Sequence, residues 1–345
     1  MNRWYEQAGP KSDVVISSRV RLARNIAGYA FPSTAEQQTL EAVLSLCKEK
    51  ISKVANGYQL HWMDLRQLTP LTRCCYIEQH LLSPDLALGN TPSGLILNEA
   101  ETMSIMINEE DHLRMQVILP GLQLEQAYAM CDAFETSFGN HVPYAFDERL
   151  GYLTECPTNL GTGLRVSAMM HLPALVHTGM MRKILDACGK MGVAVRGVYG
   201  ENSEAEGDLF QISNQVTLGY AEGEILENMT HIISQIEEKE MQMRQKLLQQ
   251  DKNALEDKIF RAYGILSNAR SISGAEAMRL LSWLYLGISM QLITCINPVN
   301  VKRLLVELQP GMVQQRVGKE INARVRDQQR ATICRTMLGK NDESV

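Results

Sequence analysis

The sequence predicts an α+β fold in which a sheet-and-helix domain, residues 1–250, precedes an all-helical domain, residues 251–345. Short apolar runs bounded by turn residues predict strands between residues 14 and 218. Stretches with helical spacing of apolar residues lie among these strands. From Gly223 onward only the helical spacing recurs, and this change of pattern places the boundary near residue 250.

Composition and charge already argue against several classes of function, before any motif is considered. The chain is 45% hydrophobic and 21% charged, and its net charge of −5 offers no basic field for nucleic acid. The sequence contains no run of about 18 apolar residues, the length that a membrane-spanning helix needs, so we expect no membrane span. None of the eight cysteines lies in paired C-x-x-C motifs, so we expect no metal held by protein side chains. The first residues lack an apolar leader, which favours free thiols and a cytoplasmic location.

The expected elements are mixed up to residue 218 and helical afterwards. Strands are predicted at 14–16 with a continuation toward 25, 95–97, 103–107, 115–119, 166–172, 193–200 and 209–213. Helices are predicted at 34–55, 71–82, 123–138, 180–191, 225–266, 275–293, 300–308 and 324–338. Pro310-Gly311 is expected to end the helix at 300–308.

Two arginines, Arg19 and Arg21, follow the first predicted strand at alternating positions. On an extended backbone they share one face. A solvated edge with scattered arginines and an anion-binding pair explain this pattern equally well. His80, near the end of helix 71–82, is by itself more typical of a cap or surface residue than of a ligand.

Three consecutive acids, Glu109, Glu110 and Asp111, directly follow the strand at 103–107. A short charge run usually marks a solvated turn. Here apolar strands lie on both sides, so partial burial or mutual repulsion would raise the pKa of one carboxyl group. Such a group is suited to acid–base catalysis.

The segment 155–165 combines a thiol, a proline turn, two glycines and an arginine. Cys156 precedes Pro157, which biases its backbone toward extended or turn geometry. Gly161 and Gly163 permit positive φ and close approach of other backbone. Arg165 offers a fork of donors suited to phosphate. The segment could therefore hold a cation at its cysteine end and an anion at its arginine end.

An acidic loop at 201–208 joins the strands at 193–200 and 209–213. Such a loop is ordinarily a solvent-exposed connection without a specific function. Its position between two apolar strands, with Arg196 before it, makes a mobile active-site flap an equal alternative.

Arginines and potential anions together suggest phosphoryl transfer to a guanidinium group. No Walker A motif is present, but arginines can neutralise a triphosphate and a transferring phosphoryl group. A guanidinium is protonated at pH 7 and must lose a proton to become a nucleophile. Two carboxylates, Glu110 and Glu201, and the thiolate of Cys156 could orient it and accept that proton.

The residues that carry this chemistry resemble the successive motifs of the ATP:guanidino phosphotransferases, the creatine and arginine kinase family. The matching segments are 17–21, 108–114, 156–165 and Arg196 with Gly200-Glu201. The resemblance implies an antiparallel sheet flanked by helices for residues 1–250. It also implies ATP as the phosphoryl donor and Mg²⁺ bridging the phosphates.

The same resemblance implies individual roles. Glu110 would be the base, Glu201 its partner and Cys156 the thiolate against the guanidinium. The five arginines would bind phosphates, and His80 would lie by the adenine or ribose. The residues implied in ATP binding are Ser17, Ser18, Arg19, Val20, Arg21, His80, Arg114, Arg165, Val166, Ser167, Ala168, Met169, Arg196, Gly197, Val198, Tyr199, Gly200 and Glu201.

Two departures from the phosphagen kinases point to a subgroup. Only 18 residues precede Arg19, where those kinases carry a helical domain of about a hundred, and an extra helical domain follows residue 250. This arrangement resembles the bacterial protein arginine kinases (McsB-type). Segment 326–331 matches the R-D-x-x-R-A phosphoarginine-binding motif of that subgroup. The motif would bind phosphoarginine through Arg326, Asp327, Arg330 and Ala331.

The function expected from the sequence is ATP-dependent phosphorylation of arginine side chains in proteins. A kinase of free arginine or another small guanidine and a phosphoarginine-binding adaptor are the alternatives. The subgroup resemblance also implies a homodimer through residues 251–345, an activator protein and a Clp protease that reads the mark. No membrane or direct nucleic-acid partner is expected.

Overall fold

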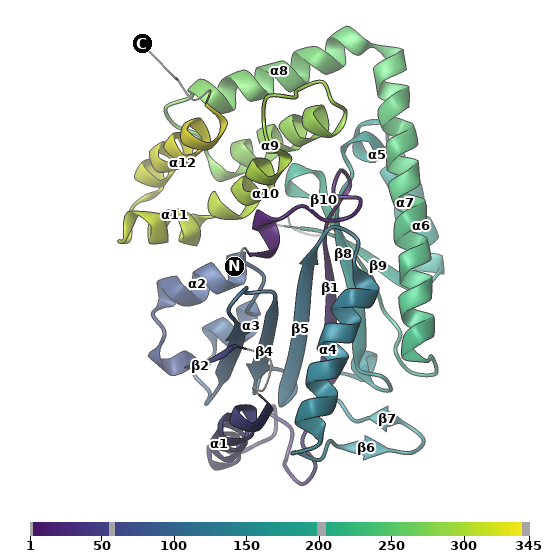
Figure 1. The fold of residues 1–345 in the computed structure, drawn as a ribbon, viewed down its shortest axis with the longest axis vertical. Helices are drawn as coiled ribbons and strands as arrows, with labels where there is room; N and C mark the ends of the chain where they lie inside the picture. The colour runs from purple at the N-terminus through teal and green to yellow at the C-terminus, as the bar shows by residue number, and fades with distance from the viewer. Residues whose placement is uncertain (1–2, 55–58, 199–204, 340–345) are drawn as a thin grey trace.

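The computed structural model describes residues 3–54, 59–198 and 205–339, and a large sheet forms its centre (Figure 1). The strands of this sheet are β1 (Val15–Arg24), β2 (Leu60–Asp64), β3 (Gly94–Asn98), β4 (Met103–Ile107), β5 (Leu113–Pro120), β8 (Leu164–His171), β9 (Val193–Gly197) and β10 (Leu209–Asn214). Their order is β2-β3-β4-β5-β1-β8-β10-β9, and every neighbouring pair is antiparallel. A separate hairpin pairs β6 (Phe146–Asp147) with β7 (Gly151–Tyr152). The predicted α+β class with an antiparallel sheet is confirmed.

Helices surround the sheet and then continue alone to the end of the described chain. They are α1 (Gln37–Val54), α2 (Pro70–Glu78), α3 (Pro84–Leu88), α4 (Leu124–Gly139), α5 (Pro173–His177), α6 (Met181–Lys190), α7 (Glu222–Gln250), α8 (Lys252–Asn268), α9 (Gly274–Ser289), α10 (Pro298–Glu307), α11 (Pro310–Val317) and α12 (Ala323–Leu338). Among the residues described, none of these helices has the length and apolar character needed to cross a bilayer.

Alternation along the central strands separates a core face from a polar face. Val20 and Leu22 of β1 are buried in one cluster with side chains of α1, α4 and α7. Since successive side chains of a strand point to opposite faces, Arg19 and Arg21 lie on the other side of the sheet. The core face thus fixes which way the arginines point.

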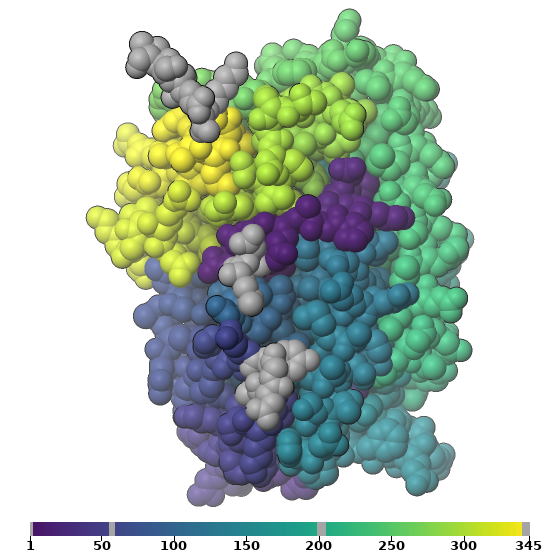
Figure 2. All heavy atoms as spheres, in the orientation of Figure 1, coloured from purple at the N-terminus to yellow at the C-terminus, as the bar shows by residue number. Residues whose placement is uncertain are grey.

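The last five helices share a second core with the beginning of the chain. Trp4 and Tyr5 are buried in this cluster beside residues of α8 to α12. Tyr285 of α9 donates its hydroxyl proton to the carbonyl of Ser12, over 2.6 Å. In Figure 2 the first residues cross the surface between these helices and the rest of the molecule. The N-terminal segment therefore joins the helical region to the sheet.

The helix predicted at 300–308 does end before Pro310-Gly311, but the new helix α11 that begins there was not predicted. Helix α10 ends at Glu307, and Pro310 is the first residue of α11. Proline is favoured at this position because its missing N–H would have no partner there and its φ already suits the helix. The helix predicted at 71–82 is also shorter than expected, because the chain leaves it after Glu78 and His80 takes a φ of 62°.

Candidate active site

Strand register brings the predicted arginines onto one face of the sheet. Arg21 of β1 lies opposite Arg165 of β8, and Arg114 of β5 lies opposite Ala23. Arg19 is opposite Ser167, whose neighbour across β10 is Ser213. These positions all share the face that Arg19 occupies. Arg196 of β9 joins them through its pairing with Gln211, which is itself opposite Met169 of β8.

Burial and charge repulsion among the arginines lower the pKa values of Arg19 and Arg21. Burial, followed by repulsion from Arg114 and Arg165, lowers the pKa of Arg19 to about 9. The same causes, burial first and then Arg19, lower the pKa of Arg21 well below its ordinary value. A guanidinium in a protein keeps its proton, so the repulsion remains until an anion offsets it. This face is therefore built for a multiply charged anion.

Unpaired donors support the same interpretation. The Nε atoms of Arg21 and Arg165 are buried and have no hydrogen-bond partner. A buried N–H without an acceptor costs free energy, about 1–3 kcal/mol by general experience with such groups. Phosphate oxygens would supply acceptors to both. The residues present thus fit a nucleotide triphosphate.

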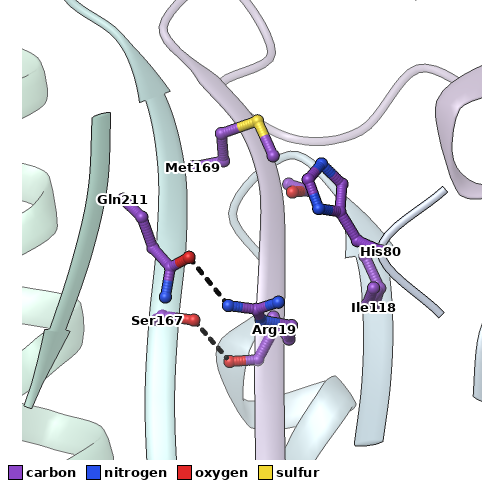
Figure 3. A pocket seen from close by; sticks show the side chains of 7 residues that line it. Arg19, His80, Ile118, Ser167, Met169 and Gln211 are labelled. Atoms are coloured by element: carbon purple, nitrogen blue, oxygen red, sulfur yellow. Dashed lines mark hydrogen bonds between the residues drawn. The ribbon is translucent and has the colours of Figure 1, made fainter. Parts of the chain in front are cut away.

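A close view shows how Arg19 is held (Figure 3). Its guanidinium donates to the Oε1 of Gln211 over 2.7 Å, and the Ser167 hydroxyl donates to its carbonyl oxygen over 3.4 Å. His80 and Met169 lie over the same pocket, and Ser17 also lines it. Burial, with a smaller effect from Arg19, lowers the pKa of His80 to about 3, so this imidazole is neutral at physiological pH.

Four of the residues expected to bind ATP have side chains on the core face instead. They are Ser18, Val20, Val166 and Ala168, each fully buried. The Ser18 hydroxyl donates to the carbonyl of Gly121 over 2.8 Å and accepts from the amide of Gln123 over 2.9 Å. Their side chains position the strands that carry the arginines and do not reach the arginine-lined face.

A larger cavity of about 330 Å³ adjoins Arg19 and Arg114. His80, Gln116 and Val198 line it, as do Glu78 of α2 and Gln309 from the helical region. The predicted residues Gly197 and Val198 thus lie at the end of β9 beside this cavity. Tyr199, Gly200 and Glu201, also predicted for the site, lie outside the described residues.

The acidic segment after β4 places Glu110 beside the arginines. Glu110 lines a small cavity of about 50 Å³ with Arg21, Arg114, Arg165 and Asn159. Glu109 instead pairs with Arg114 over 2.5 Å. Burial alone would raise the pKa of Glu109, but Arg114 outweighs it and the net shift is downward. Two adjacent acids thus have different partners.

Asp111 is a site residue for which sequence reasoning gave no specific role. Its Oδ1 accepts from the Nδ2 of Asn25 over 2.6 Å and from the amide of Glu155 over 2.8 Å. It therefore ties the acidic segment to the residue just before Cys156. Burial raises the pKa of Asp111 to about 6. No short-range pattern reveals these contacts, because Asn25, Asp111 and Glu155 are far apart in the sequence.

Cys156 stands at the start of a short 3-10 turn, Pro157–Asn159. Its Sγ lies 3.0 Å from the Oγ1 of Thr158. Asn159, at the end of this turn, lines the same small cavity as Glu110 and Arg165. The turn that begins at Cys156 and the segment that carries Glu110 thus both border the arginine-lined cavity, and their catalytic roles stay predictions. The part of the prediction that concerns Glu201 cannot be placed within the described ranges.

The two glycines of this segment have the backbone that the sequence predicts. Gly161 has a φ of 101° and Gly163 a φ of 63°. A Cβ atom at Gly163 would lie 2.6 Å from the carbonyl oxygen of Ala23, closer than real Cβ contacts. Only glycine fits where this loop crosses β1. The loop that carries Cys156 is therefore held against the arginine strand.

The segment 326–331 lies in α12, where Arg330 is buried. Its Nε donates to the carbonyl of Leu308 over 2.9 Å, and its Nη1 donates to Ile272 and to Asp327. Arg326 is half-buried and donates to the carbonyl of Ile321 over 3.0 Å. Ala331 is fully buried. Arg330 thus joins the ends of helices and is buried, whereas Arg326 is half-buried.

Across the described ranges, no group of three or more His, Cys, Asp or Glu residues is arranged to hold a metal ion. All eight cysteines are free thiols.

Comparison with known proteins decides the family. The model of the ATP:guanido phosphotransferase C-terminal catalytic domain matches residues 42–243, and that of the protein-arginine kinase McsB C-terminal domain matches residues 252–344. The chain belongs to the protein-arginine kinases, a group of ATP:guanido phosphotransferases. A protein-arginine kinase of Moorella thermoacetica is 44% identical over 98% of this chain and 97% of its own length. One from Brevibacillus brevis is 43% identical over 98% and 95%.

Solved structures of other guanidino kinases share the fold of this protein-arginine kinase family member. The duplicated taurocyamine kinase from Schistosoma mansoni aligns with a TM-score of 0.57 at 28% identity, over 66% of this chain and 33% of that one. This chain thus spans about a third of that duplicated protein. Lombricine kinase aligns with a TM-score of 0.58 at 24% identity, over 69% and 70%, and supports the fold alone.

Proposed function

We propose that this protein is an ATP-dependent kinase of arginine side chains in proteins. One observation carries the proposal: five arginines share a sheet face, and Glu110 and Cys156 lie beside them. The arginines suit the phosphates of ATP, and the anionic groups suit a guanidinium. The names of the relatives, which are protein-arginine kinases along nearly their whole length, support a protein as the acceptor.

The proposed reaction is a single in-line transfer. A guanidinium nitrogen of the target arginine attacks the γ-phosphorus, and an N–P bond forms. The bond from that phosphorus to the bridging oxygen breaks, and ADP leaves with the electron pair. The proton lost by the nitrogen passes to the carboxylate of Glu110. Arg21, Arg114 and Arg165 offset the charge that develops on the phosphoryl oxygens.

The remaining groups would orient the reactants. Cys156, as a thiolate, would hold the far side of the guanidinium by charge. Glu201 would be the second carboxylate, in the segment that the structure leaves undescribed. Mg²⁺ would enter with ATP and would neutralise part of the charge on its phosphates.

The test is direct detection of phosphoarginine. The protein is incubated with ATP and an arginine-rich folded protein, and the products are analysed by mass spectrometry at neutral pH because the N–P bond is acid-labile. Phosphoarginine on the protein is the expected result. Its absence on every protein tried, with ATP binding intact, would refute the proposal. Rapid ADP release with free arginine alone would favour a small-guanidine kinase.

We also propose a second, regulatory site for phosphoarginine at Arg326, Asp327, Arg330 and Ala331. Asp327 is partly exposed and could face a guanidinium; Arg330 is paired with it over 2.6 Å, and Arg326 lies one turn before Arg330. Because buried Arg330 holds two backbone carbonyls and half-buried Arg326 holds one, Arg326→Ala disturbs the fold less and is the cleaner test. Activation by added phosphoarginine should be lost in this variant. Equal activation of variant and wild type would argue against the site.

We also propose binding partners and a cellular location for this protein, by analogy with its family. A homodimer through the helical region would be measured by sedimentation at several concentrations. A cytoplasmic location, an activator protein and a Clp-type protease that degrades the phosphorylated protein complete the proposed setting.

A further inference from the structure

Large apolar side chains are exposed next to the loop that carries Cys156. Two are on the β6–β7 hairpin, Phe146 at 58% and Leu150 at 44% exposure. Three are on the loop between β10 and α7: Val216 at 49%, Leu218 at 45% and Tyr220 at 51%. We call these five residues the apolar rim.

Backbone contacts join both parts of the rim to the Cys156 loop. Gly161 pairs with Tyr152 of the hairpin, and a Cβ on Gly161 would lie 2.8 Å from the Cα of Leu218. The Thr217 hydroxyl lies 3.0 Å from the carbonyl oxygen of Thr158 and 2.6 Å from that of Leu160, and it can donate its proton to either. The rim is therefore fixed to the same loop that positions the thiol.

We propose that the apolar rim binds the polypeptide that flanks the target arginine, and that it favours an apolar side chain near that arginine. This inference rests on the proposed function, because it names the protein context that the same site accepts. An arginine side chain has only three methylene groups between its guanidinium and its backbone. When the guanidinium reaches Glu110 and Cys156, the neighbouring residues of the substrate must lie over the surface around the Cys156 loop.

The apolar rim shares residues with a groove that could bind the side chain of the flanking residue. Val216 and Tyr220 also line a groove of about 560 Å³ with Met191, Ile225 and Met229. Val193 at the start of β9 and Ile232 of α7 line the same groove. An apolar side chain beside the arginine would bury surface there, whereas a serine would not. Exposed apolar side chains gathered at the mouth of a site typically mark a binding surface.

The test compares two peptides that each contain one arginine, flanked by leucines in one and by serines in the other. Wild type should phosphorylate the leucine peptide with at least about tenfold higher kcat/KM, as expected for burial of one leucine side chain. In Leu218→Ser/Tyr220→Ser this preference should disappear. Leu88→Ser is the matched control, because Leu88 is 82% exposed and lies in α3, outside the rim. It should keep the preference.

The outcomes separate this inference from the proposed function. If wild type phosphorylates neither peptide nor any protein, the proposed function fails. If it phosphorylates both peptides equally, or if the double variant keeps the preference, the rim inference is overturned and the function stands. A double variant that sediments as a smaller species than wild type would assign the rim to contact with a second copy and overturn the inference.

Discussion

Three neighbouring acids, Glu109, Glu110 and Asp111, have three different surroundings. Glu109 is paired with Arg114, and Asp111 is tied to Asn25 and to the backbone of Glu155. Glu110 is exposed and faces the cavity that Arg21 and Arg165 line. Of the three, Glu110 has the access that a general base needs. The run of acids indicates a catalytic carboxyl group, and the family resemblance implies that it is Glu110; this role stays a prediction.

Replacing Glu110 with glutamine should remove transfer and spare nucleotide binding. The amide keeps the size of the side chain but cannot accept the guanidinium proton, so kcat should fall by about 10²–10⁴-fold. ATP affinity should stay within about twofold of wild type, since the arginines proposed to bind phosphate are unchanged. Phosphoarginine formation and nucleotide titration are the measurements. Glu99→Gln, at an exposed position on the β3–β4 turn, is the control and should match wild type.

Asp111 should give the protein a distinct pH dependence of stability. Its folded pKa is raised from 3.8 to about 6, mainly by burial. Between these values the folded state binds more protons than the unfolded state, so the free energy of unfolding should fall as pH rises from about 4 to 6. The contribution is at most about 3 kcal/mol. Below pH 4 this contribution is fully present, and above pH 6 it is lost.

The Asp111→Asn variant isolates that effect. Its Oδ1 can still accept from Asn25 and from the amide of Glu155, so the loop should stay in place. Urea unfolding at pH 4, 5, 6 and 7 should show a flatter profile than wild type over pH 4–6. An unchanged profile would mean that another group titrates there.

At the scale of elements, alternation could be predicted from the sequence and register could not. Arg19 and Arg21 alternate on one strand, which local reasoning recognises. Their neighbours Gln211 and Ser213 come from β10, about 190 residues away in sequence, and only the antiparallel pairing brings them to the same face. The short elements β2, α3 and α5 were not predicted, because each is too brief to establish a period.

Helix α2 and helix α11 are joined by one carboxylate. Glu78 accepts from the amides of Gly311 and Met312, both over 2.8 Å, at the N-terminus of α11. Burial raises the pKa of Glu78, and these two amides act against that shift. The next residue before α11, Gln309, lines the cavity beside Arg19. The contact therefore fixes a residue of the helical region in the candidate nucleotide site.

Replacing Glu78 with alanine should destabilise the protein and weaken nucleotide binding. Two buried amides lose their acceptor, which costs about 1–3 kcal/mol for each group that stays unsatisfied. Glu78→Gln keeps one carbonyl acceptor and should fall between alanine and wild type. Denaturant unfolding and ADP titration measure the two effects. Glu320→Ala, at an exposed position after α11, is the control. A loss of stability with unchanged ADP affinity would show that the contact does not position Gln309.

For the whole molecule, the sequence predicted the two kinds of architecture but not how they meet. Helical spacing after Gly223 indicated helices, and the structure has them. Nothing local predicts that Trp4 and Tyr5 pack among α8 to α12, because contacts between the two ends of a chain have no periodic signal. These contacts place the helical region beside the arginine-lined face.

The uncompensated charges on the arginine-lined face of the sheet lower the free energy of unfolding of the protein without nucleotide. Arg21 carries a charge that burial and three other arginines disfavour, and its Nε has no acceptor. Replacing a buried, unpaired charge by an apolar side chain of similar length commonly stabilises a fold by about 1–4 kcal/mol. If ATP binds here as proposed, its phosphate oxygens would supply both countercharge and acceptors and reverse the balance. Stability and nucleotide binding should therefore respond in opposite directions to a change at Arg21.

The Arg21→Met variant tests this directly. Without nucleotide its free energy of unfolding should exceed that of wild type by about 1–2 kcal/mol. With ADP at a hundred times the wild-type Kd, wild type should gain about 2.7 kcal/mol and the variant much less. Arg279→Met, at an exposed position of α9, is the control and should change neither value. A variant that is less stable than wild type without nucleotide would show that Arg21 serves the fold rather than the ligand.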